Sequence, residues 1–335
     1  MECPQLQVRN LRTHFFTENG LVRAVDDVSY VLNKGQTLGL VGESGCGKSV
    51  SALSLMRLIT PPGKIVGGEI LLDDLNLLDI PEPQMRQIRG NWISMIFQEP
   101  MTSLNPVFTI GNQIMETIRV HQKVSRAEAR DLTIDVLSKV KIPAASNRID
   151  EFPHQMSGGM RQRVMIAMAL ACSPKVLIAD EPTTALDVTI QAQIMKLLAD
   201  LQNDLHMSIL LITHNLGLVA EASDHIAVMY ASKVVEYTST RNLFTSPLHP
   251  YTQGLLTSVP TLGMPKNREL NVIPGQVPNP LYFPSGCKFH PRCPLAENQC
   301  QEEEPLLKEV NPGHWVACHM IKGEVTPLQE SDHDH

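Results

Sequence analysis

The chain has 335 residues, of which 43% are hydrophobic, and a formal net charge of −7. This is enough apolar material for one large core and a smaller second part. The acidic balance, without a visible basic patch, argues against a nucleic-acid-binding protein, and no apolar run approaches the ~20 residues that a helix needs to cross a bilayer.

The amino end carries no targeting pattern and then turns to strands. Its first ten residues show neither the apolar core of a signal peptide nor a basic leader, which favours a cytoplasmic protein that meets a membrane only through partner chains. Residues 6–41 read as alternating strands, with a hairpin turn at Asn19 and Gly20. The last of these strands is the apolar run 38–41.

A glycine-rich loop follows that strand and leads into a helical pattern over 50–59. It reads GESGCGKS, a full match to the G-x-x-x-x-G-K-[ST] phosphate-binding loop, in the strand–loop–helix context that the motif needs. We expect all eight of its residues to contact a nucleoside triphosphate. They are Gly42, Glu43, Ser44, Gly45, Cys46, Gly47, Lys48 and Ser49.

The chemistry of this loop explains the expectation. Glycines let the backbone turn its N–H groups toward phosphates at a helix N-terminus, where the helix dipole also favours negative charge. Lys48 is expected to reach the β- and γ-phosphates and Ser49 to ligate Mg²⁺. The alternative is a chance glycine-rich turn before a helix, and the independent motifs described next argue against it.

The middle of the chain changes to helical spacing. After a strand at 69–72, apolar residues recur as in amphipathic helices through 110–120 and 127–140, within a segment of about 101–165. Another amphipathic helix is predicted at 195–205.

Two apolar strands end in residues that can do chemistry. Residues 176–179 lead into Asp180 and Glu181, and residues 209–212 lead through Thr213 into His214. Open α/β sheets place their ligands at the carboxyl ends of such strands. Asp180 can hold Mg²⁺ and Glu181 can polarise an attacking water. A lone histidine after a strand is more often an ordinary loop residue, but His214 comes in order with the other motifs, so we assign it to the site.

These motifs resemble, in order and spacing, those of an ABC transporter ATPase over about the first 245 residues. The motifs are the phosphate loop, Gln98 after the strand 93–97, MSGGM at 156–160, the Asp180–Glu181 pair, ALD at 185–187 and His214. The resemblance implies a P-loop ABC-type α/β fold: a RecA-like core, an N-terminal antiparallel β subdomain and a helical insert at about 101–165. In that family two ATPase domains close head to tail around ATP.

The family pattern also implies roles for single residues. Ser157, Gly158 and Gly159 contact the γ-phosphate of ATP bound by a partner subunit. Gln98 senses Mg²⁺ and contacts the membrane subunit, and His214 holds the γ-phosphate. The remaining assignments are Asp187, which organises the dimer seam, and Phe15, which stacks on adenine, with Phe16 as a near-equal alternative.

Two positions depart from the family pattern. Met160 stands where the signature usually has Gln, and Asn215 replaces an Asp that often follows the histidine. The residues that touch phosphate in the family are intact, so we expect a functional half-site.

Beyond Phe244 the chain becomes rich in proline and loses helical periodicity. This tail opens with HPYT at 249–252, which resembles the C-terminal extension of peptide-permease ATPases, as do the runs at 98–106 and 158–170. The resemblance is greatest to the D-type subunit of oligopeptide permeases, with the dipeptide type close behind. We therefore divide the chain into an ABC ATPase domain at 1–245 and a small irregular metal-binding extension at 246–335.

The resemblance implies an ATP-hydrolysing subunit that drives import of oligopeptides or dipeptides. Its partners would be a second, related ATPase subunit, two transmembrane permease subunits and, indirectly, an extracytoplasmic peptide-binding protein, so it would lie on the cytoplasmic face of the bacterial inner membrane. The alternative that the chain serves an importer of the same build for nickel or antimicrobial peptides is left open. A soluble ABC ATPase acting on DNA or ribosomes is disfavoured, because neither a second cassette nor a long coiled-coil insertion is predicted.

Four cysteines lie in the tail: Cys287, Cys293, Cys300 and Cys318. A disulfide is disfavoured in a reducing cytosol, and a zinc site usually contains a C-x₂₋₄-C pair, which is missing. Four thiolates suit a [4Fe–4S] cluster, and similar tails in the peptide-permease family carry one. We expect that cluster, with Zn²⁺ as the alternative, to clamp a segment with few means of building its own core.

Overall fold

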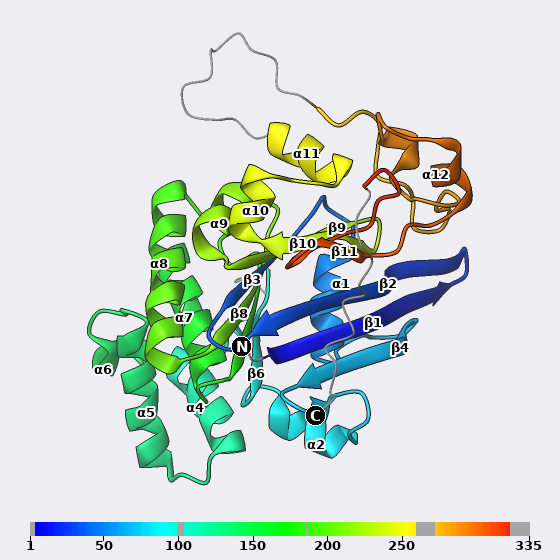
Figure 1. Cartoon of the computed structure of the whole chain (residues 1–335). Coiled ribbons are helices and arrows are strands. Elements are labelled where there is room, and N and C mark those ends of the chain that lie inside the picture. Colours follow the sequence, from blue (N-terminus) through cyan, green and yellow to red (C-terminus); the bar gives the residue numbers. More distant parts are fainter. Residues whose placement is uncertain (1–3, 99–103, 185, 259–271, 322–335) are drawn as a thin grey trace, which may run out of the picture. The chain divides into compact units, whose positions relative to one another are not determined.

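The computed structural model describes residues 4–98, 104–184, 186–258 and 272–321. The chain divides into two compact units. Figure 1 labels their helices and strands. The helical unit comprises Met1–Gln5, Leu32–Gln36 and Asp79–Leu211. The loop unit comprises Leu6–Val31, Thr37–Leu78 and Ile212–His335, and contains the phosphate loop and the tail.

The first sheet of the loop unit is antiparallel. Its strands run in the order β2 (Gly20–Asn33), β1 (Pro4–Thr17), β4 (Gly63–Leu72) and β5 (Leu75–Asn76). Because β1 ends at Thr17 and β2 begins at Gly20, the predicted hairpin turn is confirmed. The sheet is the antiparallel β subdomain that the sequence predicted.

A second set of strands in the loop unit runs in the order β11 (Lys308–Asn311), β12 (His314–Val316), β10 (Lys233–Ser239), β9 (His225–Tyr230) and β3 (Thr37–Val41). All five residues of β3 are buried, and β3 pairs with β9 in parallel. The phosphate loop therefore leaves a buried strand and enters α1 (Lys48–Leu55), as predicted.

Beyond α1, the helices of the loop unit are short. They are α9 (Leu216–Ala222), α10 (Thr240–Thr245), α11 (Pro250–Thr257), the 3₁₀ turn η2 (His290–Arg292) and α12 (Asn298–Glu302). Pro250 and Pro291 each occupy the first turn of their helix, where a missing N–H costs nothing.

The tail builds a core through packing, which corrects the expectation that it needs a metal clamp. Tyr251 and Phe289 are buried in a cluster with Tyr230, and Ile273 packs against it. In addition, β12 joins β10 with Glu236 opposite Val316. The apolar residues are too scattered among prolines to show a periodic pattern, yet they meet in one cluster.

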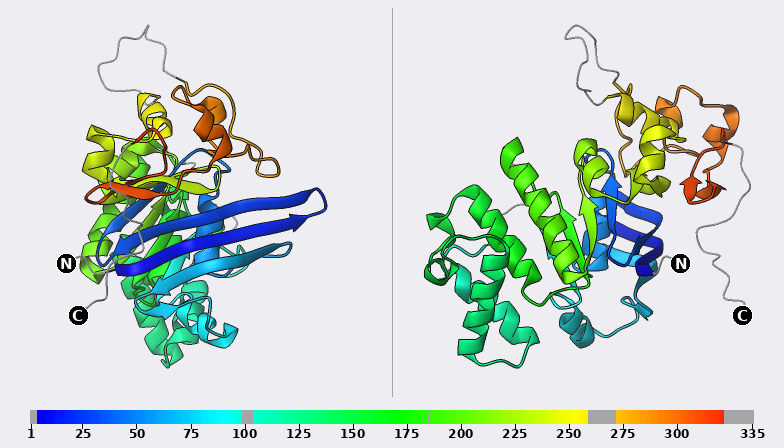
Figure 2. Two further views of the ribbon diagram at one scale, coloured as in Figure 1. Left: turned by 45° about the vertical axis from the view of Figure 1, so that its right-hand side comes forward. Right: turned by 60° about the vertical axis from the view of Figure 1, so that its left-hand side comes forward.

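The helical unit holds three strands in the order β8 (Ser208–Ile212), β7 (Val176–Asp180) and β6 (Ile93–Ile96), with β6 and β7 parallel. Around them lie α2 (Glu82–Ile88), α4 (Ile110–His121), α5 (Arg126–Lys139), α6 (Ala145–Arg148), the 3₁₀ turn η1 (Pro153–Gln155), α7 (Gly158–Leu170) and α8 (Val188–Leu205). Helix α4 packs against α5 and α7, which are among the green helices of Figure 2, and α7 packs against β6.

Capping residues set where these helices begin. Ser125 and Glu128 form a reciprocal capping box at α5. The Asp187 carboxylate accepts a hydrogen bond from the Ile190 amide and starts α8, seven residues before the helix predicted from 195. Among the described residues, no helix combines the length and apolar content that crossing a membrane requires.

Candidate nucleotide-binding site

The phosphate loop has the backbone geometry that its glycines allow. Gly42, Gly45 and Gly47 have φ of 155°, 80° and 104°, in the region that favours glycine. At Gly47 a Cβ atom would lie 2.2 Å from the carbonyl oxygen of Ala24, so no side chain fits there. The loop can therefore turn its amides inward only with glycine at these positions.

Lys48 is buried at the start of α1, with 6% of the residue exposed. Its ammonium donates hydrogen bonds to the carbonyl oxygens of Gly42, at 2.8 Å, and Glu43, at 3.0 Å. The Cys46 sulfur lies 3.7 Å from the same nitrogen. A buried cation enclosed by the phosphate loop is suited to bind an anion there.

Sequence reasoning missed a connection between the phosphate loop and the tail. Arg292 donates two hydrogen bonds to the carboxylate of Glu43, at 2.9 and 3.2 Å, and the Tyr251 hydroxyl accepts one from the Glu43 amide at 3.0 Å. These partners are 249 and 208 residues from Glu43, so no local pattern could have revealed them.

In the helical unit, two side chains hold the carboxylate of Glu181. Gln98 Nε2 donates to Glu181 Oε2 at 3.0 Å, and Thr184 Oγ1 donates to the same oxygen at 2.8 Å. Glu181 has φ of 47°, a left-handed conformation that is uncommon for non-glycine residues. Asp180 precedes it at the end of β7 and is 4% exposed. Gln98 and Glu181, two of the predicted site residues, thus lie in hydrogen-bond contact.

The signature residues and Asp187 line one groove in the helical unit. Ser157 caps α7 by accepting a hydrogen bond from the Met160 amide at 3.4 Å. A Cβ on Gly158 would meet no described atom within 4 Å, whereas one on Gly159 would lie 3.2 Å from Ile190 Cγ2. The groove is lined by Ser157, Gly158, Gly159, Met160, Arg163, Leu186, Asp187 and Ile190.

His214 and the aromatic candidates lie in the loop unit. His214 is exposed directly before Asn215, whose side chain caps α9. Phe15 is half-buried, and its ring lies against Gly63, where an added Cβ would approach Phe15 Cε1 to 2.6 Å. Phe16 is 53% exposed. The adenine contact stays a prediction for either ring.

The tail cysteines do not form the predicted metal site. In the described part of the chain, no group of three or more His, Cys, Asp or Glu side chains is placed to hold a metal ion. The prediction of a [4Fe–4S] cluster on Cys287, Cys293, Cys300 and Cys318 is therefore wrong, and the zinc alternative loses its support. All four are free thiols.

The physical reason is burial. It raises the pKa of Cys287 to about 11, which disfavours the thiolate form that binds metal ions. Cys287 and Cys293 pack against the apolar cluster of the tail. Buried cysteine behaves as a small apolar residue, and that is its role here.

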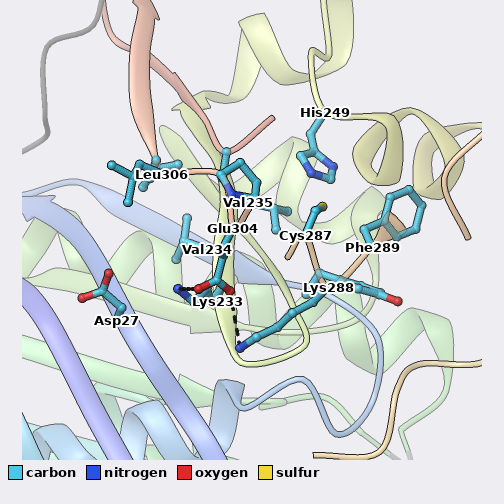
Figure 3. Close-up of a pocket in the computed structure, with 14 residues that line it drawn as sticks. Asp27, Lys233, Val234, Val235, His249, Cys287, Lys288, Phe289, Glu304 and Leu306 are labelled. Carbon is cyan, nitrogen blue, oxygen red and sulfur yellow. Dashed lines mark hydrogen bonds and ion pairs between the residues drawn. The ribbon is translucent and has the colours of Figure 1, made fainter. Parts of the chain in front are cut away.

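A small hollow lies beside this cluster, also within the loop unit (Figure 3). Glu304 lies between two lysines at its edge, with Lys233 Nζ 2.7 Å from Oε2 and Lys288 Nζ 4.0 Å from Oε1. Val235, Phe289 and other apolar side chains line it as well, together with Asp27 and His249. No residue predicted to bind the nucleotide lines it, so we assign it no part in nucleotide binding.

The residues present fit a magnesium nucleotide. The glycine backbone and the buried Lys48 suit a polyphosphate. In the loop unit the Ser49 hydroxyl is the kind of hard oxygen ligand that Mg²⁺ prefers, and in the helical unit the Asp180 carboxylate is another.

Comparisons with known proteins agree with this chemistry. The family model described as "ABC transporter" matches residues 25–184, and the model described as "Oligopeptide/dipeptide transporter, C-terminal region" matches residues 235–300.

Three relatives match nearly end to end. A probable peptide ABC transporter ATP-binding protein, y4tR, of Sinorhizobium fredii is 52% identical, covering 93% of this chain and 94% of the relative. The oligopeptide transport ATP-binding protein AppD of Bacillus subtilis is 51% identical, covering 95% and 97%. The dipeptide transport ATP-binding protein DppD of Escherichia coli is 50% identical, covering 94% and 96%.

Solved structures share the fold. The ATP-binding cassette MJ0796, in a dimeric post-hydrolysis state bound to ADP and Pi, aligns with a TM-score of 0.63 at 25% identity, over 70% of this chain and 99% of that one. CbiO1 of Clostridium perfringens, part of the transporter complex cbiONQ, aligns with a TM-score of 0.62 at 27% identity, over 73% and 92%.

Proposed function

The chain belongs to the ABC transporter family of ATP-binding subunits, and from this premise we propose that it hydrolyses ATP to energise peptide import. The observation that carries the proposal is the near end-to-end match to peptide-transport ATP-binding proteins, together with a phosphate loop folded around a buried Lys48.

The loop unit binds the triphosphate. Amides of the phosphate loop donate to the phosphates, and Lys48 turns its ammonium from the carbonyls of Gly42 and Glu43 to phosphate oxygens. Ser49 would hold the Mg²⁺ that accompanies the nucleotide and neutralises charge on the phosphates, and Asp180 is the Mg²⁺ ligand that we propose in the helical unit. His214 orients the γ-phosphate, and an aromatic ring, Phe15 or Phe16, stacks on the base.

Glu181 performs the proton chemistry of hydrolysis. Its carboxylate accepts hydrogen bonds from Gln98 and Thr184 on one oxygen, Oε2. These two bonds hold Oε2 in place, and the carboxylate can accept a proton from water attacking the γ-phosphate. Gln98, which holds the catalytic carboxylate, is also the residue that we assign to the contact with the membrane subunit.

The signature groove serves a second ATPase subunit. Gly158 presents backbone with no side chain in front of it, and the Ser157 hydroxyl lies beside it at the N-terminus of α7, where an anion is favoured. We assign this groove to the γ-phosphate held by a related partner subunit, with Asp187 at the seam. We also propose that the chain has two domains, an ABC ATPase domain at 1–245 and the tail at 246–335.

Peptides are the proposed solute, because the relatives are named for oligopeptide and dipeptide transport and the tail matches the model for that class. This favours peptides over nickel. Two transmembrane permease subunits form the pore and an extracytoplasmic binding protein delivers the peptide. The chain would then lie at the cytoplasmic face of the bacterial inner membrane.

The test is reconstitution of the chain with its permease subunits and partner ATPase in vesicles that contain ATP. Labelled dipeptides and longer peptides should be taken up only with ATP and the binding protein present. ATP-driven uptake of nickel but of neither peptide length would overturn the solute assignment, and the absence of ATP hydrolysis would overturn the proposal as a whole.

A further inference from the structure

One residue of the phosphate loop, Glu43, is held through three of its groups. Its carbonyl oxygen accepts a hydrogen bond from Lys48 Nζ at 3.0 Å. Its amide donates to the Tyr251 hydroxyl at 3.0 Å, and its carboxylate accepts two hydrogen bonds from Arg292, at 2.9 and 3.2 Å. Glu43 thus joins the lysine of the phosphate loop to two residues of the tail.

Arg292 is itself fixed before it reaches the loop. Its side chain is 5% exposed. Its Nε donates to the carbonyl oxygen of Pro274 at 2.9 Å, and the guanidinium carbon lies 5.7 Å from the centre of the Tyr230 ring. A two-bond pair from an already oriented guanidinium loses little side-chain entropy, so it constrains the loop more than a flexible surface pair does.

Tyr251 is held equally firmly. It is fully buried, and its ring centre lies 4.6 Å from that of Tyr230 and 5.5 Å from that of Phe289. Its amide donates to Nδ1 of His249 at 3.0 Å, at the start of α11. The hydroxyl that meets Glu43 therefore cannot move without the core of the tail.

We propose that the tail positions the phosphate loop for ATP through Glu43, with Arg292 and Tyr251 as positioning residues. This rests on the proposed function of the loop. Arg292 does two things there: it orients the first turn of the loop, and it neutralises a carboxylate that belongs to a polyphosphate-binding loop. Without Arg292, the charge of Glu43 would oppose the charge of ATP, and Glu43 would lose the two hydrogen bonds that hold its side chain in place.

The charge argument predicts an order among variants. Arg292→Gln leaves a carboxylate uncompensated and should weaken ATP binding most, by about tenfold, as expected for the loss of one charge-assisted pair at a partly exposed site. Glu43→Gln removes the carboxylate and should weaken binding less, by about threefold or under. The double variant Glu43→Gln with Arg292→Gln should bind like Glu43→Gln alone, because no unpaired charge remains. Tyr251→Phe keeps the ring and should weaken binding by about threefold.

The experiment is a calorimetric titration of the full-length chain with ATP and Mg²⁺, with KM and kcat then measured in the assembled transporter. The effect of Arg292→Gln should fall on ATP affinity and KM, with kcat within about twofold of the unmodified protein, since no reacting atom is touched. Glu304→Gln is the matched control. It breaks the ion pair between Glu304 and Lys233, neither of which belongs to the phosphate loop, and should leave ATP affinity unchanged (Figure 3).

Each result has a defined meaning. Unchanged ATP affinity in Arg292→Gln overturns the proposal, as does a double variant as weak as Arg292→Gln alone, or an equal loss in Glu304→Gln. If Arg292→Gln does not fold, as judged by circular dichroism, Tyr251→Phe decides, and native affinity in that variant overturns the proposal. Lys48→Ala separates the two hypotheses: if it binds ATP like the unmodified chain, the proposed function fails, whatever Arg292 does.

Discussion

Replacing Glu181 with Gln tests the assignment of catalysis most directly. The amide has the shape of the carboxylate, so the packing around it is unchanged. Its oxygen can still accept from Gln98 or Thr184, which now donate to one carboxylate oxygen at 3.0 and 2.8 Å. What is lost is the capacity to accept a proton from water, and a general base typically contributes ~10²–10⁴-fold to the rate. We therefore expect kcat to fall within that range.

The assay is phosphate release by the assembled transporter at saturating ATP, with ATP affinity of the full-length chain measured in parallel. Affinity should stay within about threefold of the native value, because the phosphate loop is intact. Gln98→Ala provides a graded comparison: it removes one of the two bonds that orient the carboxylate, and should lower kcat by about threefold to tenfold. Turnover at the native rate in Glu181→Gln would refute the reasoning.

Three further changes follow from the geometry. Lys48→Ala should weaken ATP binding by about 10- to 100-fold, as expected when a buried cation is lost from a polyphosphate site, and a native titration curve would contradict this. Gly158→Asp should abolish ATPase activity of the assembled transporter by placing a carboxylate in the signature groove, while the chain alone binds ATP normally; activity that persists would count against the groove. Burial lowers the pKa of His249 to about 4 from an ordinary 6.5, so its contribution to stability is complete above pH 6.5 and is lost as the pH falls toward 4, by about 2 kcal/mol at pH 5. The unfolding temperature should fall more between pH 7 and pH 5 for the native chain than for His249→Asn, which keeps a capping acceptor but does not titrate. An equal fall in both chains would show that His249 is not the group responsible.

Local chemistry accounts for what could be predicted. The phosphate loop is contiguous: its glycines, lysine and serine all lie within eight consecutive residues. The strand that ends at Asp180 and Glu181 could be recognised too, because four apolar residues followed by two carboxylates are typical of a buried strand that ends at a ligand site. Helices α4 and α5 were predicted because their apolar residues recur at helical spacing.

What could not be predicted depends on distant contacts. Nothing near Arg292 in the sequence points to Glu43, since the pairing requires the tail to return to the loop. The cysteines were misjudged for a related reason. Four thiols in a proline-rich segment suggest a metal, but the sequence does not show that Tyr251, Phe289 and Ile273 converge on the same place and bury two of those thiols partly among apolar side chains.

Two glycines described above are required on different grounds, with a consequence for any attempt to evolve or redesign the protein. A methyl group at Gly47 would collide with Ala24, so selection for folding alone would retain that glycine. At Gly158 a methyl group would meet no described atom within 4 Å, and alanine is the better helix former. Laboratory evolution for heat resistance, or a design program that rewards stability, would therefore tend to replace Gly158. The loss of function would be detected only when ATP hydrolysis was measured with the second subunit present.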